Sequence, residues 1–129
     1  MTSIYIDALG TDYEKPVRAG LEFLGPLSAV KPGDRVFIKP NLTFPTFRKG
    51  VMTNPECLEG LVKVLKDHTA HITVGESDAG GYNRFDMDDV LVKTGVKDLE
   101  KKYGIRVVNL SRLPVGEVKV ECHGREQAF

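Results

Sequence analysis

The chain has 129 residues and a mass of 14.3 kDa, which is the size of one ordinary domain. Eighteen Lys and Arg residues balance 18 Asp and Glu residues, so no overall charge attracts nucleic acid or an anionic membrane surface. A hydrophobic content of 41% with 28% charged residues is typical of a folded globule, and it excludes disorder as the main state.

The chain begins with a pattern typical of a strand followed by a helix. Residues 3–7 alternate between apolar and polar side chains, which predicts a first strand. Apolar residues at helical spacing over residues 17–24 predict a helix. Thr11 or Asp12 can cap its start, and the glycine of a Gly-Pro pair limits its end at Gly25.

The middle of the chain repeats this alternation after a turn at residues 31–34. Residues 35–38 form a short apolar strand, and the segment up to Thr53 lacks any period and is predicted to be a long loop. Asn54 then caps a helix that has proline in its first position. The apolar stripe of this helix is Leu58, Leu61, Val62 and Leu65. Residues 71–75 form the next predicted strand.

The last third continues the same order. Asp86 can cap a helix that Gly95 ends, a further helical stretch runs to Gly104, and residues 105–110 form another strand. Residues 115–121 alternate in the way of an antiparallel strand with one polar face. We therefore predict one α/β domain over residues 1–129. Its expected architecture is a three-layer αβα sandwich with a Rossmann-like, mostly parallel sheet and an antiparallel strand near the C-terminus.

A basic segment lies where the second predicted strand ends. Residues 31–50 carry five cations and one anion, a local charge of +4. In α/β sheets ligands bind beyond the carboxyl ends of the strands, and the amides of a helix start favour an anion there. The predicted binding residues for a phosphate or carboxylate group are Lys39, Asn41, Thr53 and Asn54, with Arg48 or Lys49 as a mobile clamp. The alternative is that Lys39 is a solvated strand-end lysine and Asn54 is only a helix cap.

An acidic segment follows the next strand. Residues 76–89 carry five anions and one cation, a local charge of −4. Glu76, Ser77 and Asp78 stand at the strand end, where carboxylates can serve as general acid and base or hold a hard cation. Asp86, Asp88 and Asp89 instead suit the dipole of a helix start. The candidate catalytic residues are Lys39, Glu76 and Asp78, and Glu76 and Ser77 complete the predicted ligand-binding set.

Several established motifs are absent from the sequence. The loop G-E-S-D-A-G-G has glycine where a phosphate-binding loop needs lysine, and no dinucleotide fingerprint follows the first strand. Cys57 and Cys122 form no metal-ligand pattern, so we expect no metal site and no iron-sulfur cluster within this segment, and the cofactor stays unknown. His68 and His71 bracket a turn at the opposite edge of the sheet and are assigned surface roles.

The protein is predicted to be located in the cytoplasm. Two widely spaced cysteines are typical of a reduced compartment, and the N-terminus has no basic region followed by an apolar stretch. No run approaches the roughly 20 apolar residues that a membrane helix needs. We therefore expect neither membrane nor nucleic acid as a partner.

Two stretches of the sequence resemble a widespread prokaryotic family. They are V-F-I-K-P-N-L at residues 36–42 and G-V-M-T-N-P-E at residues 50–56, followed by a helix and V-G-E-S at residues 74–77. In order and spacing they are similar to the N-terminal part of the domain of unknown function three-six-two. Members of that family are usually longer, and many carry ferredoxin-like segments, so the resemblance implies an association with iron-sulfur proteins. No established catalytic residues can be transferred from it.

The sequence thus favours a domain that binds an anionic small molecule or cofactor group at the C-terminal edge of the sheet. The alternative is an accessory or redox-partner module whose charged loops dock a second protein, a further copy of the chain or a missing C-terminal portion. A third interpretation is that the basic and acidic segments neutralise each other internally. Whether the protein is an enzyme stays open.

Overall fold

The computed structural model describes residues 3–8, 10, 12–78, 85–114, 116, 119–122 and 125–128. Its centre is a parallel sheet in the order β1 (Arg35–Ile38), β2 (His71–Glu76) and β3 (Arg106–Asn109). The helices are α1 (Glu14–Leu24), α2 (Pro55–Lys66), α3 (Met87–Lys93) and α4 (Leu99–Tyr103), with short 3-10 turns η1 (Leu27–Ala29), η2 (Val96–Asp98) and η3 (Leu110–Arg112). Parallel neighbours in chain order require crossover connections, and α2 lies in the first of these while α3 and α4 lie in the second. The predicted α/β class is confirmed.

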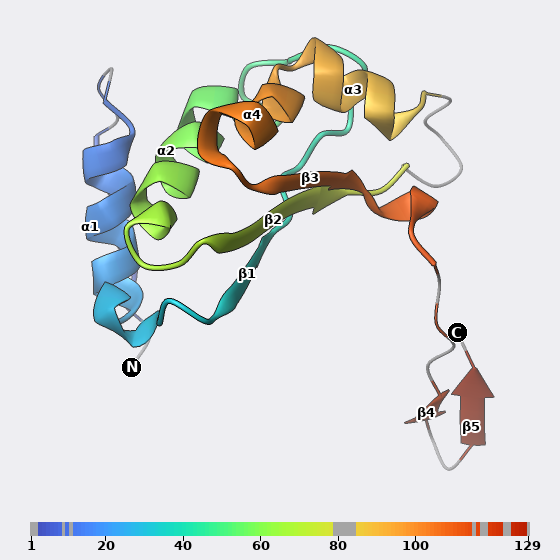
Figure 1. The fold of residues 1–129 in the computed structure, drawn as a ribbon. Coiled ribbons are helices and arrows are strands. Elements are labelled where there is room, and N and C mark those ends of the chain that lie inside the picture. Colours follow the sequence, from blue (N-terminus) through green and yellow to red (C-terminus); the bar gives the residue numbers. More distant parts are fainter. Residues whose placement is uncertain are drawn as a thin grey trace.

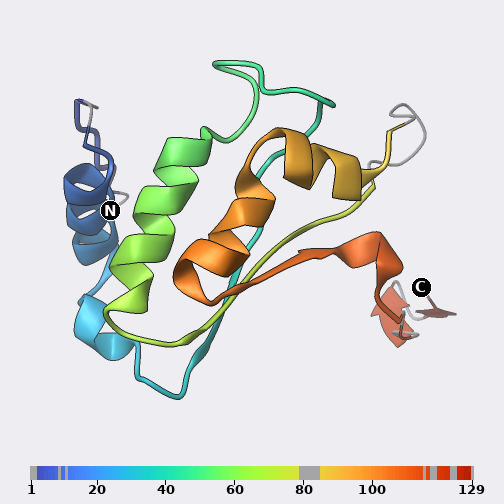
Figure 2. The same ribbon diagram turned by 45° about the horizontal axis from the view of Figure 1, so that its top comes forward.

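The helices cover one face of the sheet. Side chains alternate along each strand, so Val36, Ile72 and Val107 point towards α2, α3 and α4 and form part of the core. Figures 1 and 2 show these helices on the same side of the sheet, with α1 beyond α2. Among the described residues no helix covers the other face, where Phe37 is 52% exposed. The structure therefore has one helical layer where a sandwich with two was expected.

Helix α2 forms as its sequence predicts. The side chain of Asn54 accepts a hydrogen bond from the backbone N–H of Glu56 at 2.8 Å, and Pro55 occupies the first helical position. Leu58, Val62 and Leu65 are buried against the sheet. At 12 residues α2 is also the longest helix in the described part of the chain, and none there is long and apolar enough to cross a bilayer.

Residues 3–7 do not form the predicted strand. Ile4 and Ile6 are 79% and 88% exposed, and the segment lies beside α1, where the rings of Tyr5 and Phe23 are 5.6 Å apart. A strand needs the edge of another strand to satisfy its backbone, and α1 and α2 separate this segment from the sheet (Figure 2). Alternation alone therefore gave the wrong prediction here.

The described C-terminal residues form a separate hairpin. Strands β4 (Lys119–Cys122) and β5 (Arg125–Ala128) pair with each other in antiparallel fashion, away from the main sheet (Figure 1). No antiparallel strand joins the main sheet in the part of the chain that the structure describes. Thr11, three positions of the predicted 115–121 strand and much of the glycine-containing loop lie outside the described residues.

Candidate functional site

The C-terminal ends of β1 and β2 enclose a cavity of about 220 Å³, which we call the strand-end pocket. Four residues expected from the sequence line it, namely Lys39, Asn41, Glu76 and Ser77. Leu42, Thr43 and Met87 complete the lining. Adjacent parallel strands end at the same edge of a sheet, which is why residues 37 positions apart in the chain meet here.

An ion pair dominates the pocket. The Lys39 Nζ lies 2.8 Å from the Glu76 Oε2, and the other carboxylate oxygen accepts a hydrogen bond from the Ser77 N–H at 2.8 Å. Glu76 is only 7% exposed, whereas the Lys39 side chain is 58% exposed. The carboxylate is therefore fixed from two sides, while the ammonium group keeps donors directed to solvent.

Thr53 and Asn54 lie outside the pocket lining and hold the loop in place. The Asn41 N–H donates to the Thr53 Oγ1 at 2.8 Å, and the Thr53 N–H donates to the Asn41 carbonyl at 2.9 Å. The Asn41 side-chain amide donates to the Val51 carbonyl at 2.9 Å, and that of Asn54 donates to the Tyr13 hydroxyl at 3.1 Å. These contacts close the loop between β1 and α2 and engage the start of α2 without a ligand.

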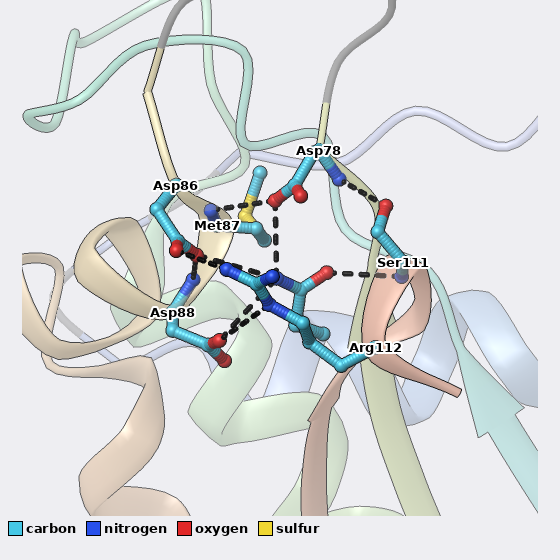
Figure 3. A network of polar contacts seen from close by, with 7 residues as sticks. Asp78, Asp86, Met87, Asp88, Ser111 and Arg112 are labelled. Carbon is cyan, nitrogen blue, oxygen red and sulfur yellow. Dashed lines mark hydrogen bonds and ion pairs between the residues drawn. The ribbon is translucent and has the colours of Figure 1, made fainter.

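Asp78 belongs to a polar network at the ends of β2 and β3. Its Oδ1 accepts hydrogen bonds from the Met87 N–H at 2.8 Å and from the Asn109 side-chain amide at 3.0 Å. The Asp78 N–H donates to the Ser111 Oγ at 2.9 Å (Figure 3). Because Asn109 is 4% exposed and its own oxygen accepts from the Ser111 N–H at 3.0 Å, the amide is held in one orientation.

Arg112 compensates part of the charge of this network. Its guanidinium forms ion pairs with Asp86 and Asp88, as Figure 3 shows. The Asp88 N–H and the Arg112 guanidinium hold the pKa of Asp86 below its ordinary value. Within the described residues, Lys39–Glu76 is the ion pair that joins the basic and acidic segments, while Asp89 pairs with Lys93 of its own helix. In the described parts of the two segments, mutual neutralisation is thus limited to one pair.

Asn109, Ser111 and Arg112 were not among the residues expected from the sequence. A signal for them exists, because Asn109 ends a predicted strand just as Asn41 follows one. Applying the strand-end rule to all three parallel strands would have placed Asn109 at the same edge. Asn109 contacts the aspartates at the start of α3 because α3 packs beside β3.

The described residues show no arrangement of three or more His, Cys, Asp or Glu side chains that could hold a metal ion. Asp78, Asp86 and Asp88 surround the Asn109 amide nitrogen, which occupies the centre of their cluster. Cys57 is a half-buried free thiol whose pKa is raised by burial, so the protonated form is favoured. The described side chains at this edge take part in ion pairs and hydrogen bonds.

The fold and the site together define the class of this protein, which is an α/β domain with an ionic pocket at the C-terminal edge of its parallel sheet. The model of the family described as domain of unknown function (DUF362) matches residues 36–128, and the chain belongs to this family. The match begins in β1 and includes every residue of the strand-end pocket. Searches of curated proteins and of solved structures returned no significant match.

Proposed function

We propose that the strand-end pocket binds a small anionic molecule, or the anionic group of a cofactor, through Lys39. The observation that carries this proposal is the asymmetry of the ion pair, in which Glu76 is buried and Lys39 is largely exposed. An ammonium group has three donors, and the hydrogen bond to Glu76 uses one of them. The remaining donors are available to a carboxylate or phosphate oxygen.

Charge and size narrow the class of ligand. Glu76 compensates Lys39 in the ligand-free pocket, so a group with one negative charge is better accommodated than one with two. A cavity of about 220 Å³ is below the roughly 300 Å³ at which pockets for drug-sized molecules begin. A carboxylate-bearing small molecule, held by Lys39 and the Ser77 hydroxyl, is therefore the ligand that the pocket favours.

The experiment measures binding of small carboxylates and phosphates to three forms of the protein by calorimetric titration. Lys39→Gln removes the cation and should abolish binding. Glu76→Gln removes the competing anion, keeps an oxygen for the Ser77 N–H and should strengthen binding roughly five-fold, about 1 kcal/mol. The two changes therefore have opposite signs, which a purely structural ion pair does not produce.

Lys31→Gln is the matched control, because Lys31 belongs to the same basic segment but bonds to the Ser28 carbonyl far from the pocket. Its affinity should equal that of the wild type. Equal affinity of the wild type and Lys39→Gln for every ligand in the panel would contradict the proposal. A loss of binding in Glu76→Gln as large as in Lys39→Gln would contradict the role of Glu76 as an anion that competes with the ligand.

A further inference from the structure

The face of the sheet that the helices leave uncovered carries two arginines and a histidine at the beginning of the strands. Arg35 is the first residue of β1, His71 the first of β2 and Arg106 the first of β3. Alternation along each strand places all three opposite the core-facing Val36, Ile72 and Val107. They lie on the open face at the edge remote from the strand-end pocket.

The strand register brings these side chains to one place. Arg35 is paired with His71, and Arg106 is paired with Thr73 on the other side of β2. With strands about 4.8 Å apart, the two arginine Cα atoms are about 12 Å from each other across β2. Two arginine side chains can converge over that span. These four residues line a cavity of about 400 Å³, which we call the basic pocket, together with Ala70, Ile72 and Gly104.

The charge of the basic pocket is poorly compensated. Among the described residues neither Arg35, His71 nor Arg106 takes part in an ion pair, although seven other Lys and Arg residues there do. Glu100 acts on Arg106 electrostatically, but its carboxylate is already held by Lys97 at 2.9 Å and by the Val107 N–H at 2.7 Å. Arg35 and Arg106 carry like charges on the two sides of β2, so an anion between them would be stabilised.

We propose that the basic pocket is a second anion site, distinct from the strand-end pocket, that takes a phosphate group. Guanidinium groups bind phosphate oxygens in a bidentate manner, and two of them facing each other match the double charge of a phosphate. His71 and the Thr73 hydroxyl lie on the strand between them and supply further hydrogen bonds. The β4–β5 hairpin descends from the opposite, C-terminal end of the sheet and leaves this edge uncovered (Figure 1).

The test follows the imidazole signals of His71 by NMR while inorganic phosphate, and separately glycerol 3-phosphate, is added to the 129-residue protein at constant ionic strength. A saturable shift with both ligands indicates recognition of the phosphate group itself, and a shift with the ester alone indicates a phosphorylated small molecule. Arg35→Gln and Arg106→Gln should each weaken binding at least tenfold. Both side chains are exposed, so the fold should tolerate the substitutions.

Two comparison variants separate this site from others. Lys15→Gln removes an exposed cation on α1 and should bind phosphate like the wild type. Lys39→Gln disables the strand-end pocket and should also leave the His71 response intact, so the two proposals can fail independently. No saturable His71 shift up to about 10 mM phosphate, or wild-type binding in both arginine variants, would overturn the proposal.

Discussion

The polar network at the ends of β2 and β3 depends on the side-chain amide of Asn109. Its nitrogen donates to Asp78 at 3.0 Å and has Asp86 and Asp88 at 3.4 Å, while its oxygen accepts from the Ser111 N–H. One buried side chain therefore joins three elements. A donor at this nitrogen is required, because three carboxylates face it.

Replacing this donor by an acceptor of the same shape should be costly. We expect Asn109→Asp to lower the free energy of unfolding by about 2 to 3 kcal/mol at neutral pH, because a buried carboxylate would face Asp78, Asp86 and Asp88 without a proton between them. Urea denaturation followed by circular dichroism measures the change. The introduced carboxyl should have a raised pKa, so the loss should shrink as the pH falls and that group takes up a proton.

Ser111→Ala serves as the control for this prediction. It removes one hydrogen bond to the Asp78 N–H at an exposed position, which should cost no more than about 1 kcal/mol. If Asn109→Asp were no more destabilising than Ser111→Ala, the buried amide would not be the centre of the network.

At the scale of elements, Asn54 shows a local signal that the structure follows closely. The sequence allows it to act as an anion ligand or as a helix cap. In the structure its side chain accepts from the Glu56 N–H and donates to the Tyr13 hydroxyl on the N-terminal side of α1. Helix α2 contributes Leu58, Val62 and Leu65 to the core. The cap therefore supports a helix that contributes to the core.

Removing the cap should weaken the whole domain through α2. Asn54→Ala is expected to reduce the free energy of unfolding by about 1 kcal/mol, and Asn54→Asp, which can still accept the Glu56 N–H, by much less. Thermal and urea denaturation measure both variants. Ligand titration of Asn54→Ala provides the control, since a variant that folds normally but no longer binds carboxylates would assign Asn54 to the site after all.

The incorrect prediction of a strand at residues 3–7 also concerns single elements. Its alternation is real, yet the side that carries Ile4 and Ile6 is exposed, and Tyr5 is the residue that contacts α1 through Phe23. A helix such as α2 satisfies its own backbone, whereas a strand requires a partner that the local sequence does not specify. Strands β1, β2 and β3 form as predicted because the helices between them bring the strands together, so that each strand has a partner.

Across the whole molecule, carboxylates link the helices to one another and to the sheet. Glu59 on α2 accepts hydrogen bonds from Lys102 at 2.6 Å and from the Tyr103 hydroxyl on α4. The Lys102 ammonium and the Tyr103 hydroxyl hold the pKa of Glu59 below its ordinary value. For Glu100 burial acts in the opposite direction, but the Val107 N–H and Lys97 still leave its pKa lowered.

These lowered pKa values predict loss of stability in acid. A carboxyl whose pKa is lower in the folded than in the unfolded state contributes stability above its unfolded pKa, and the contribution is lost as the pH falls through the folded pKa. We expect the free energy of unfolding to be nearly constant above about pH 5 and to fall steadily below about pH 4. Urea denaturation over a pH series measures this profile.

Glu59→Gln should flatten part of that profile. The variant loses about 1 kcal/mol at neutral pH and should depend less on pH in acid than the wild type does. Glu56→Gln removes an exposed carboxyl from the same helix without breaking the contacts to α4, and its acid profile should match that of the wild type. An unchanged slope in Glu59→Gln would show that this carboxyl does not link stability to pH.

The sequence by itself determined the features that depend on near neighbours in the chain. The start of α2 at Asn54, the bounds of β1 and the left-handed glycines Gly95 and Gly104 after the helices all follow from local backbone and hydrogen-bonding preferences. The strand-end rule also placed Lys39 and Glu76 at one edge, because parallel strands share a direction. The resemblance to the family is also visible in the sequence, and the family model matches residues 36–128.

Only the tertiary structure decided which distant groups meet. It pairs Lys39 with Glu76, surrounds Asn109 with aspartates from α3 and brings Arg35, His71 and Arg106 together on the uncovered face. It also decides that helices cover one face of the sheet (Figure 1). Contacts of this kind depend on which elements pack side by side. That choice is made by the burial of the entire apolar surface, to which any single stretch of sequence contributes only a part.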